Sequence, residues 1–244
     1  MNKKRLDVLL FERGLCDSRN LAQRIIMAGE VRVDGNIAAK PSQMFDEQSA
    51  IQIKEKPRYV SRGGIKLEKA LHAFGLEDLD GKVCVDVGSS TGGFTDCLLQ
   101  HGARLVYAVD VGYGQLHYSL RNDRRIKVME RTNVRKITGF PEPISLVTID
   151  ASFISLKIIL PVVKNWPFKQ ELQIIALIKP QFEVGREIAA RGKGVIVNEE
   201  DRKNVIDGII SFSRQKGFLF QNLIESPLVG PKGNTEFLVY LIYK

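Results

Sequence analysis

Val83–Asp96 has the sequence VCVDVGSSTGGFTD, in which an apolar run of β-branched residues ends in Asp86 and enters a glycine-rich turn. This pattern is typical of the strand–turn–helix entrance to a nucleotide-type cofactor site. A second strand-like run, Arg104–Asp110 (RLVYAVD), also ends in an acid. Asp110 follows Asp86 by 24 residues, near the offset of about 20 residues at which an acid binds ribose hydroxyls in such sites. Together the turn and the two acids predict a nucleoside-binding edge.

The form of the turn indicates which cofactor it takes. It is not G-x-G-x-x-G, and it lacks the lysine of a phosphate-binding P-loop. These differences favour S-adenosylmethionine over NAD or ATP, because S-adenosylmethionine brings no phosphates to bind. Asn133, after the predicted strand Ile126–Met129, is placed to meet the adenine edge. The predicted cofactor-binding residues are Asp86, Gly88, Ser89, Ser90, Gly92, Gly93, Phe94, Asp110 and Asn133. A plainer interpretation stays open, in which the acids cap nearby helices and Asn133 is structural.

Residues 65–244 alternate predicted strands and helices, which indicates an α/β fold with a doubly wound, mostly parallel, Rossmann-like sheet. Four charged residues stand at the edges of these elements. They are Lys66 after the predicted turn Arg62–Gly64, Asp150 after Ile144–Ile149, Lys179 after Leu172–Ile178, and Glu236 before Phe237–Tyr243. Since strand ends meet at one edge of such a sheet, we expect the four to converge. The alternative is that such a residue only faces solvent at the end of a strand, which explains one of them more easily than all four.

Two amines and two acids suit metal-free methyl transfer to a ribose hydroxyl. The hydroxyl is a poor nucleophile until its proton is removed. A lysine can remove that proton only if its pKa falls well below the free value of about 10.4. A second cation nearby lowers it, while carboxylates hold the amines in place. The catalytic set predicted from the sequence is therefore Lys66, Asp150, Lys179 and Glu236.

Residues 1–57 form a separate predicted domain, joined by a linker at 58–64 to the larger domain at 65–244. Helices are expected at Arg5–Arg13 and Arg19–Met27, followed by strands at Val31–Val33, Asn36–Ala38 and Ala50–Ile53. Four arginines fall around the helices and the hairpin, and one cationic face suited to RNA phosphates is expected from them: Arg5, Arg19, Arg24 and Arg32. A helical cap with scattered charge is the simpler alternative.

Charge and composition limit the classes of protein that fit. The net charge is +8, and residues 1–66 hold 13 Lys or Arg against 8 Asp or Glu, which favours a polyanionic partner. No apolar run is long enough to span a bilayer, so no membrane partner is expected. Three cysteines, Cys16, Cys84 and Cys97, have no metal-binding spacing. They indicate a reducing, cytoplasmic setting without a metal.

Several motifs together resemble a known family. R-L-D-x-x-L at Arg5–Leu10 and A-G-E-V-R-V-D-G at Ala28–Gly35 resemble the small RNA-binding S4 domain, and the order Lys66, Asp150, Lys179, Glu236 looks like the tetrad of FtsJ-like RNA ribose methyltransferases. With S-R-G-G-I-K-L at Ser61–Leu67, D-A-S-F-I-S-L at Asp150–Leu156 and K-P-Q-F-E at Lys179–Glu183, the whole chain resembles the TlyA family.

That resemblance implies 2′-O-methylation of ribosomal RNA cytidines, with S-adenosylmethionine as cofactor and ribosomal RNA or ribosomal subunits as partners. It implies that Lys179 is the base, tuned by Lys66 and Asp150, with Glu236 completing the network. Two other classes remain open: an RNA-binding ribosome assembly factor with a degenerate methyltransferase domain, and a haemolysin or membrane-active protein. The sequence leaves the oligomeric state undecided.

A basic loop and one aromatic residue are each open to two interpretations. The basic loop Gly185–Gly194 (GREIAARGKG) either closes over RNA or is a surface loop. Phe153 either stacks on a base or packs in the core.

Overall fold

Two units make up the chain, Met1–Pro57 and Arg58–Lys244, which we name the N-terminal unit and the C-terminal unit. The computed structural model describes residues 3–54, 57–185 and 192–244. Residues 58–64, the predicted linker, lie within the C-terminal unit, where the Tyr59 side chain is buried.

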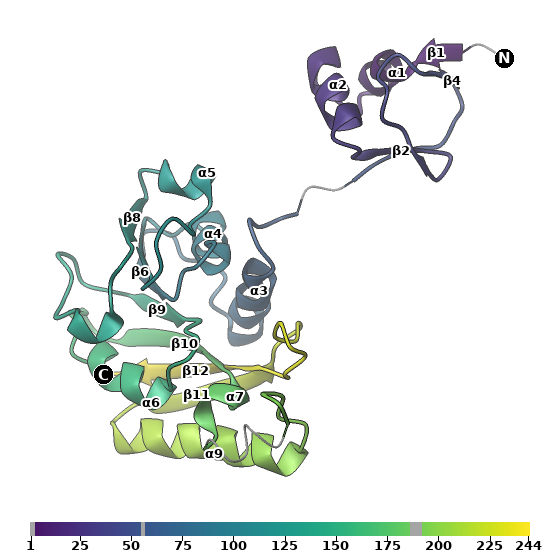
Figure 1. Ribbon diagram of the computed structural model, residues 1–244. Helices are drawn as coiled ribbons and strands as arrows, with labels where there is room; N and C mark the ends of the chain where they lie inside the picture. The colour runs from purple at the N-terminus through teal and green to yellow at the C-terminus, as the bar shows by residue number, and fades with distance from the viewer. Residues whose placement is uncertain (1–2, 55–56, 186–191) are drawn as a thin grey trace. The chain divides into compact units, whose positions relative to one another are not determined.

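The N-terminal unit contains two helices and two small antiparallel sheets (Figure 1). Its elements are β1 (Lys3–Arg5), α1 (Leu6–Glu12), α2 (Arg19–Met27), β2 (Val31–Val33), β3 (Asn36–Ile37), β4 (Met44–Asp46) and β5 (Ile51–Ile53). The Ser18 side chain caps α2 by accepting a hydrogen bond from the backbone N–H of Leu21 at 3.2 Å. Apolar side chains of α1, α2 and β2 form one core. The sequence did not predict β1 and β4, because segments of three residues are too short to show an alternation of polar and apolar residues.

The C-terminal unit alternates helices and strands along most of its length (Figure 1). Its elements are α3 (Gly63–Phe74), β6 (Val83–Val87), α4 (Gly93–Gln100), β7 (Leu105–Val109), α5 (Tyr118–Arg121), β8 (Ile126–Met129), the 3₁₀ helix η1 (Val134–Lys136), β9 (Leu146–Ile149), α6 (Leu156–Val163), β10 (Leu172–Ile178), α7 (Pro180–Glu183), α9 (Glu199–Gln215), β11 (Leu219–Glu225) and β12 (Phe237–Tyr243). The sequence placed a turn at Arg62–Gly64, but α3 already begins at Gly63, so Lys66 lies in the first turn of that helix.

One sheet of seven strands organises this unit, in the order β11-β12-β10-β9-β6-β7-β8. Strands β10, β9, β6, β7 and β8 are parallel, and β12 runs antiparallel between β10 and β11. Strands β7 and β8 follow on one side of β6, whereas β9 and β10 follow on its other side. The direction of the strand order therefore reverses beside β6. The predicted α/β, Rossmann-like sheet is confirmed, with its antiparallel pair at one edge.

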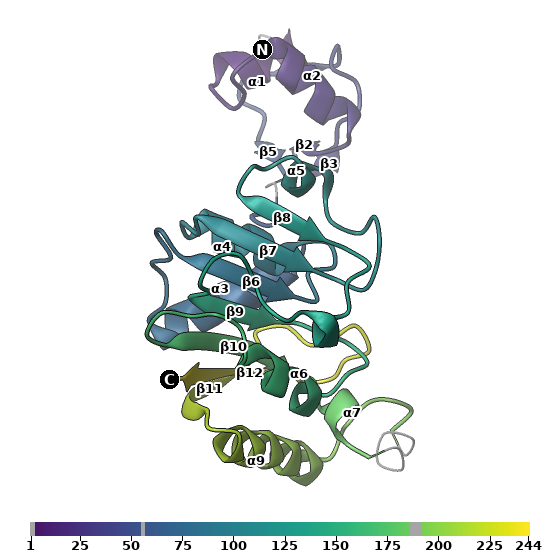
Figure 2. The ribbon, with the colours of Figure 1, turned by 90° about the vertical axis from the view of Figure 1, so that its left-hand side faces the viewer.

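Helices cover both faces of the sheet (Figures 1 and 2). Side chains from α3, α4 and α5 form a core on one face, and those from α6 and α9 form a core on the other. Strand β6 feeds both cores, since Val83, Val85 and Val87 face one and Cys84 faces the other. With both faces covered, the carboxyl edge of the strands is left for a ligand.

Candidate active site

Gly88 brings the glycine-rich turn against the end of β9. It has a φ of +83°, and a Cβ at this position would lie 2.7 Å from the carbonyl oxygen of Asp150. The backbone N–H of Asp150 donates to the Val87 carbonyl at 2.9 Å. Only glycine allows this contact without strain. The turn and Asp150 are therefore fixed to each other by backbone contacts.

Asp110 fixes the other side of the turn. Its carboxylate accepts hydrogen bonds from the backbone N–H of Ser90 at 2.8 Å and of Gly112 at 2.6 Å. Ser90 has a φ of +48°, which is uncommon for a residue other than glycine. The hydrogen bond to Asp110 holds Ser90 in that conformation. A carboxylate oxygen has further lone pairs, so Asp110 can still accept from ribose hydroxyls.

Asp86 lies below the turn and is fully buried. The hydroxyls of Thr95 and Thr148 donate to its two carboxylate oxygens at 2.6 and 3.0 Å. Burial raises the pKa of Asp86 to about 7, against the opposing effect of these two hydrogen bonds. Asp86 does not line either of the cavities described below. Its contacts tie β6 to α4 and β9.

Glycines also let α3 and α4 begin in contact. A Cβ on Gly93 would lie 2.8 Å from the backbone nitrogen of Gly64, and a Cβ on Gly64 would lie 2.2 Å from the Tyr59 ring. The first turn of α3, which carries Lys66, therefore packs directly on the first turn of α4. This explains why pairs of glycines occur in both S-R-G-G-I-K-L and the cofactor turn.

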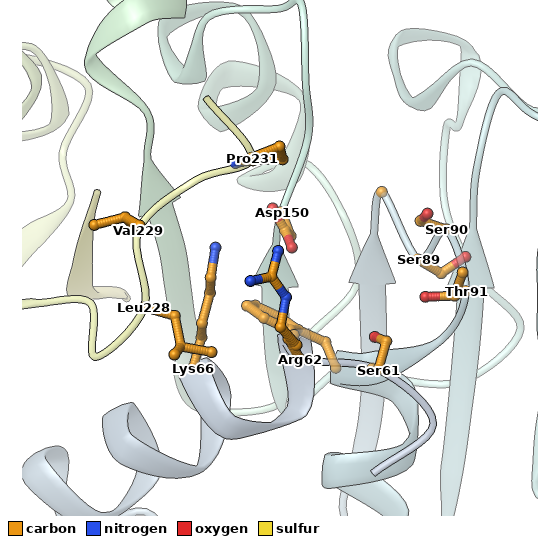
Figure 3. Close-up of a pocket in the computed structure, with 14 residues that line it drawn as sticks. Ser61, Arg62, Lys66, Ser89, Ser90, Thr91, Asp150, Leu228, Val229 and Pro231 are labelled. Atoms are coloured by element: carbon orange, nitrogen blue, oxygen red, sulfur yellow. The ribbon is translucent and has the colours of Figure 1, made fainter. Parts of the chain in front are cut away.

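Two cavities meet at Gly88, Ser90 and Asp150, which line both of them. The larger cavity has a volume of about 620 Å³, and Asp110 and Asn133 line it together with other polar residues and with apolar residues. The smaller, of about 210 Å³, lies between the start of α3, the turn and the segment 228–231. Figure 3 shows the side chains of Arg62, just before α3, and of Lys66, on α3, pointing toward Asp150 in this smaller cavity.

Lys179 pairs with Asp150 at the junction of the cavities. Its ammonium lies 2.6 Å from the Asp150 carboxylate and donates to the Ser152 hydroxyl at 2.9 Å. Lys179 is only 9% exposed. Pro180 follows it at the start of α7, and Glu183 at the end of that helix accepts from Ser155 and the backbone of Leu156. The K-P-Q-F-E motif thus anchors Lys179 to α6.

Lys66, which lines the smaller cavity, pairs with Glu236. Their charged atoms lie 2.6 Å apart, and Glu236 is 1% exposed. Gly230 lies over this acid, since a Cβ there would be 2.5 Å from its Oε1. Buried Asn234 shapes the same loop by accepting from the backbone N–H of Ile196 and donating to the carbonyl of Gly194. The interior position of Glu236 is set by this loop.

The structure brings most of the predicted site together. The four charged residues form two ion pairs, and Lys66 and Asp150 line the same cavity. Gly88, Ser89, Ser90, Gly93 and Phe94 also line one cavity or the other, and Gly92, with a φ of +96°, forms the N-cap of α4. Asn133 lines the larger cavity while its side-chain oxygen caps η1 by accepting from the Arg135 N–H.

Phe153 is 89% exposed and lines the larger cavity, so the alternative of core packing is wrong. Its φ is +64°, and its ring lies 4.9 Å from that of Phe182. Sequence reasoning missed Ser152, Asn234 and Arg62 as site residues. Ser152 and Arg62 belong to motifs quoted above, which could have pointed to them. The role of Asn234 follows only from the burial of its side chain in the structure. Residues 186–191 of the basic loop predicted at Gly185–Gly194 lie outside the described residues.

The four predicted RNA-binding arginines are exposed in the N-terminal unit. Arg5 and Arg19 both contact Asp7, and Arg32 donates to the carbonyl of Gly35 at 2.9 Å. In the described residues we find no group of three or more His, Cys, Asp or Glu side chains arranged to hold a metal. Nor does any helix there combine the length and apolar character needed to cross a membrane.

Comparison with known proteins identifies the family. Residues 59–243 match the FtsJ-like methyltransferases, and residues 4–51 match the S4 domain. The chain is 42% identical to the 16S/23S rRNA (cytidine-2′-O)-methyltransferase TlyA of Mycobacterium tuberculosis, over 98% of this chain and 90% of that protein. The chain belongs to the TlyA family of FtsJ-like methyltransferases.

Two other members of this family are named for a different activity. Hemolysin A of Brachyspira hyodysenteriae is 41% identical over 98% of this chain and 99% of that protein. The solved structure of a candidate hemolysin from Streptococcus thermophilus is 43% identical, with a TM-score of 0.74 over 100% of this chain and 90% of the other. The expected S4 and FtsJ-like parts of the TlyA resemblance are both confirmed.

Proposed function

We propose that this methyltransferase transfers a methyl group from S-adenosylmethionine to the ribose 2′-hydroxyl of ribosomal RNA cytidines. The observation that carries the proposal is the pair of lysine–carboxylate contacts, Lys179 with Asp150 and Lys66 with Glu236, since Asp150 and Lys66 line one cavity with the glycine-rich turn. The names of the TlyA relatives support the substrate.

The cavity residues fit S-adenosylmethionine. Gly88 lines both cavities, and no residue of the turn supplies a lysine for phosphates. In our proposal Asp110 accepts from the ribose hydroxyls of the cofactor and Asn133 meets its adenine edge. The cofactor, when bound, supplies an electrophilic methyl group. Asp86 ties β6, which leads into the turn, to α4 and β9 through Thr95 and Thr148.

The residues of this chain then have to position a ribose and move one proton. Lys179 is the proposed base, and its Nζ accepts the proton of the 2′-hydroxyl. Asp150 and Ser152, which both line the larger cavity, hold that nitrogen in place. Glu236 holds Lys66, the proposed second cation, at the wall of the smaller cavity. Positioning contributes to the rate because a hydroxyl that is held in line with the methyl group reacts in an effectively unimolecular step.

The rim of the site supports an RNA substrate. Phe153 presents an exposed ring beside the larger cavity, and base stacking on an aromatic ring contributes about 1–3 kcal/mol. The N-terminal unit is proposed to dock ribosomal RNA through Arg5, Arg19, Arg24 and Arg32, as the S4 match suggests.

The proposal is tested by mapping ribose methylation in ribosomal RNA by mass spectrometry, from cells with and without this gene. A methylated cytidine should disappear without the gene and return with the wild-type chain but not with Lys179→Ala. Binding of S-adenosylmethionine without turnover on either ribosomal subunit would instead favour an assembly factor. Leakage of liposomes by the purified protein would favour the haemolysin alternative.

A further inference from the structure

A buried carboxylate in the N-terminal unit joins two arginines that we propose to bind RNA. Arg5 donates to Asp7 through Nε and Nη2, each at 3.0 Å, in a bidentate contact. Arg19 donates from Nη2 to the same carboxylate at 3.1 Å, and Gln23 donates at 2.8 Å. Since Arg5 precedes α1 and Arg19 begins α2, Asp7 connects the starts of two helices that lie side by side (Figures 1 and 2).

The burial of these groups is uneven. The side chain of Asp7 is 0% exposed, whereas those of Arg5 and Arg19 are 44% and 50% exposed. The acid is therefore inside the unit, with its two partners at the surface. Its hydrogen bonds, that from Arg5 first, hold the pKa of Asp7 well below its usual range. Within the described residues, Nη1 of neither guanidinium has a hydrogen-bond partner, so each retains donors for a ligand.

We propose that Asp7 is a positioning residue, which holds Arg5 and Arg19 together as a preformed clamp for RNA phosphates. The inference rests on the proposed RNA docking by the N-terminal unit. Two guanidiniums side by side repel each other, and free arginine side chains sample many rotamers. A shared buried carboxylate removes both obstacles before RNA arrives. The remaining N–H groups match the planar, bidentate recognition that arginine gives to phosphate oxygens.

This role makes an unusual prediction about charge. Asp7, Arg5 and Arg19 together carry a net charge of +1, so removing the acid raises the local charge to +2. If the surface acted only through net charge, RNA would then bind more tightly. If Asp7 orders the clamp, RNA binds more weakly although the protein is more positive. The two accounts therefore predict opposite changes in RNA affinity when Asp7 is removed.

The chain offers a matched control in the same unit. Lys4 pairs with Glu12 at 2.7 Å, and both side chains are well exposed, at 36% and 46%. Glu12→Gln removes one acid from the surface without touching the proposed clamp. It should leave rRNA affinity unchanged or raise it up to about threefold, as an exposed ion pair near a polyanion allows.

The test measures binding of the full chain to purified, deproteinised 16S and 23S rRNA by filter binding over a series of NaCl concentrations. Asp7→Asn is expected to weaken binding at least about tenfold and to lower the salt slope by about one, because one phosphate contact is lost. Binding by Asp7→Asn as tight as wild type, or tighter, with an unchanged slope, would overturn the clamp.

Asp7→Asn could instead weaken binding by unfolding the N-terminal unit, which amide NMR spectra of the full chain would reveal, so a second variant is needed. Arg5→Lys keeps the charge and an ion-pair partner for Asp7 but cannot make the bidentate contact. It should weaken rRNA binding about fivefold with the fold retained, and unchanged affinity would also overturn the clamp. Deletion of residues 1–57 separates the two proposals, since an undiminished rRNA affinity after deletion rejects the docking function itself.

Discussion

Gly88 and Asp150 touch through their backbones, at a separation that leaves no room for a Cβ: one built on Gly88 would lie 2.7 Å from the Asp150 carbonyl oxygen. One residue therefore serves two purposes. It lines the proposed cofactor cavity, and it sets the position of the acid that holds Lys179. A change at Gly88 should disturb both.

Gly88→Ala should abolish detectable S-adenosylmethionine binding in calorimetry and cost about 1–3 kcal/mol of stability, from positive φ and the clash together. Gly81→Ala is the matched control, because Gly81 has a φ of +69° and no atom within 4 Å of its added Cβ. That variant should lose only the stability that a positive φ costs a residue with a Cβ, and it should keep the cofactor affinity. Equal cofactor affinities for the two variants would contradict the proposed role of Gly88 in the cofactor cavity.

Lys179→Ala should reduce methylation of ribosomal subunits by at least about 100-fold, the usual contribution of a general base. S-adenosylmethionine affinity should stay within a few-fold of wild type, because the lysine contacts Asp150 and Ser152 rather than the residues predicted to bind the cofactor. Methyl incorporation from labelled cofactor measures the first effect. Lys203→Ala, on the exposed side of α9, should leave both unchanged. Retained turnover in Lys179→Ala would remove it as the base.

The Lys66–Glu236 pair should show strong coupling. Lys66→Met and Glu236→Gln each leave one charge without its partner in a largely buried site, so each should destabilise the protein by about 2–4 kcal/mol. The double variant should be less destabilised than the two single effects predict together, as a double-mutant cycle in urea would show. Additive losses would mean that the two charges act independently.

Asp86 should give the protein a pH-dependent stability. Burial raises its pKa to about 7, whereas in the unfolded chain it is near 3.9. The folded protein therefore holds a proton that the unfolded chain has lost, and the contribution of Asp86 to stability falls as pH rises from about 4 to about 7. Asp86→Asn should flatten the pH dependence of urea unfolding over this range. Asp207→Asn, an exposed acid on α9, should leave it unchanged; identical slopes for all three proteins would exclude a raised pKa.

Phe153→Ala should leave the melting temperature and S-adenosylmethionine affinity near wild type, because the ring is exposed. Loss of a stacked base would weaken productive rRNA binding by about 1–3 kcal/mol, seen as a raised KM for ribosomal subunits. Tyr118→Ala, which removes a ring that is 80% exposed on α5, is the control. An unchanged KM in Phe153→Ala would leave the ring without a part in substrate binding.

Local sequence predicted much of this structure because local forces set much of it. The bounds of α2, β8, β10 and β12 match the expected ranges, since apolar periodicity and a capping serine are sequence signals. Other elements depended on distant contacts. Strands β1 and β4 exist only because they pair with each other. The glycines before Lys66 continue into a helix because α4 packs against them.

The sequence alone determined the kinds of group that the site contains: a glycine turn without phosphate-binding lysine, and two amines with two acids at element edges. Tertiary structure decided which groups face each other. Lys66 and Glu236 are 170 residues apart and meet through the loop that ends at β12, Asp86 lies inside the protein instead of on a cavity wall, and Asp7 gathers two arginines. Side-chain chemistry is written residue by residue, but burial and pairing of charges exist only once distant segments pack and exclude water.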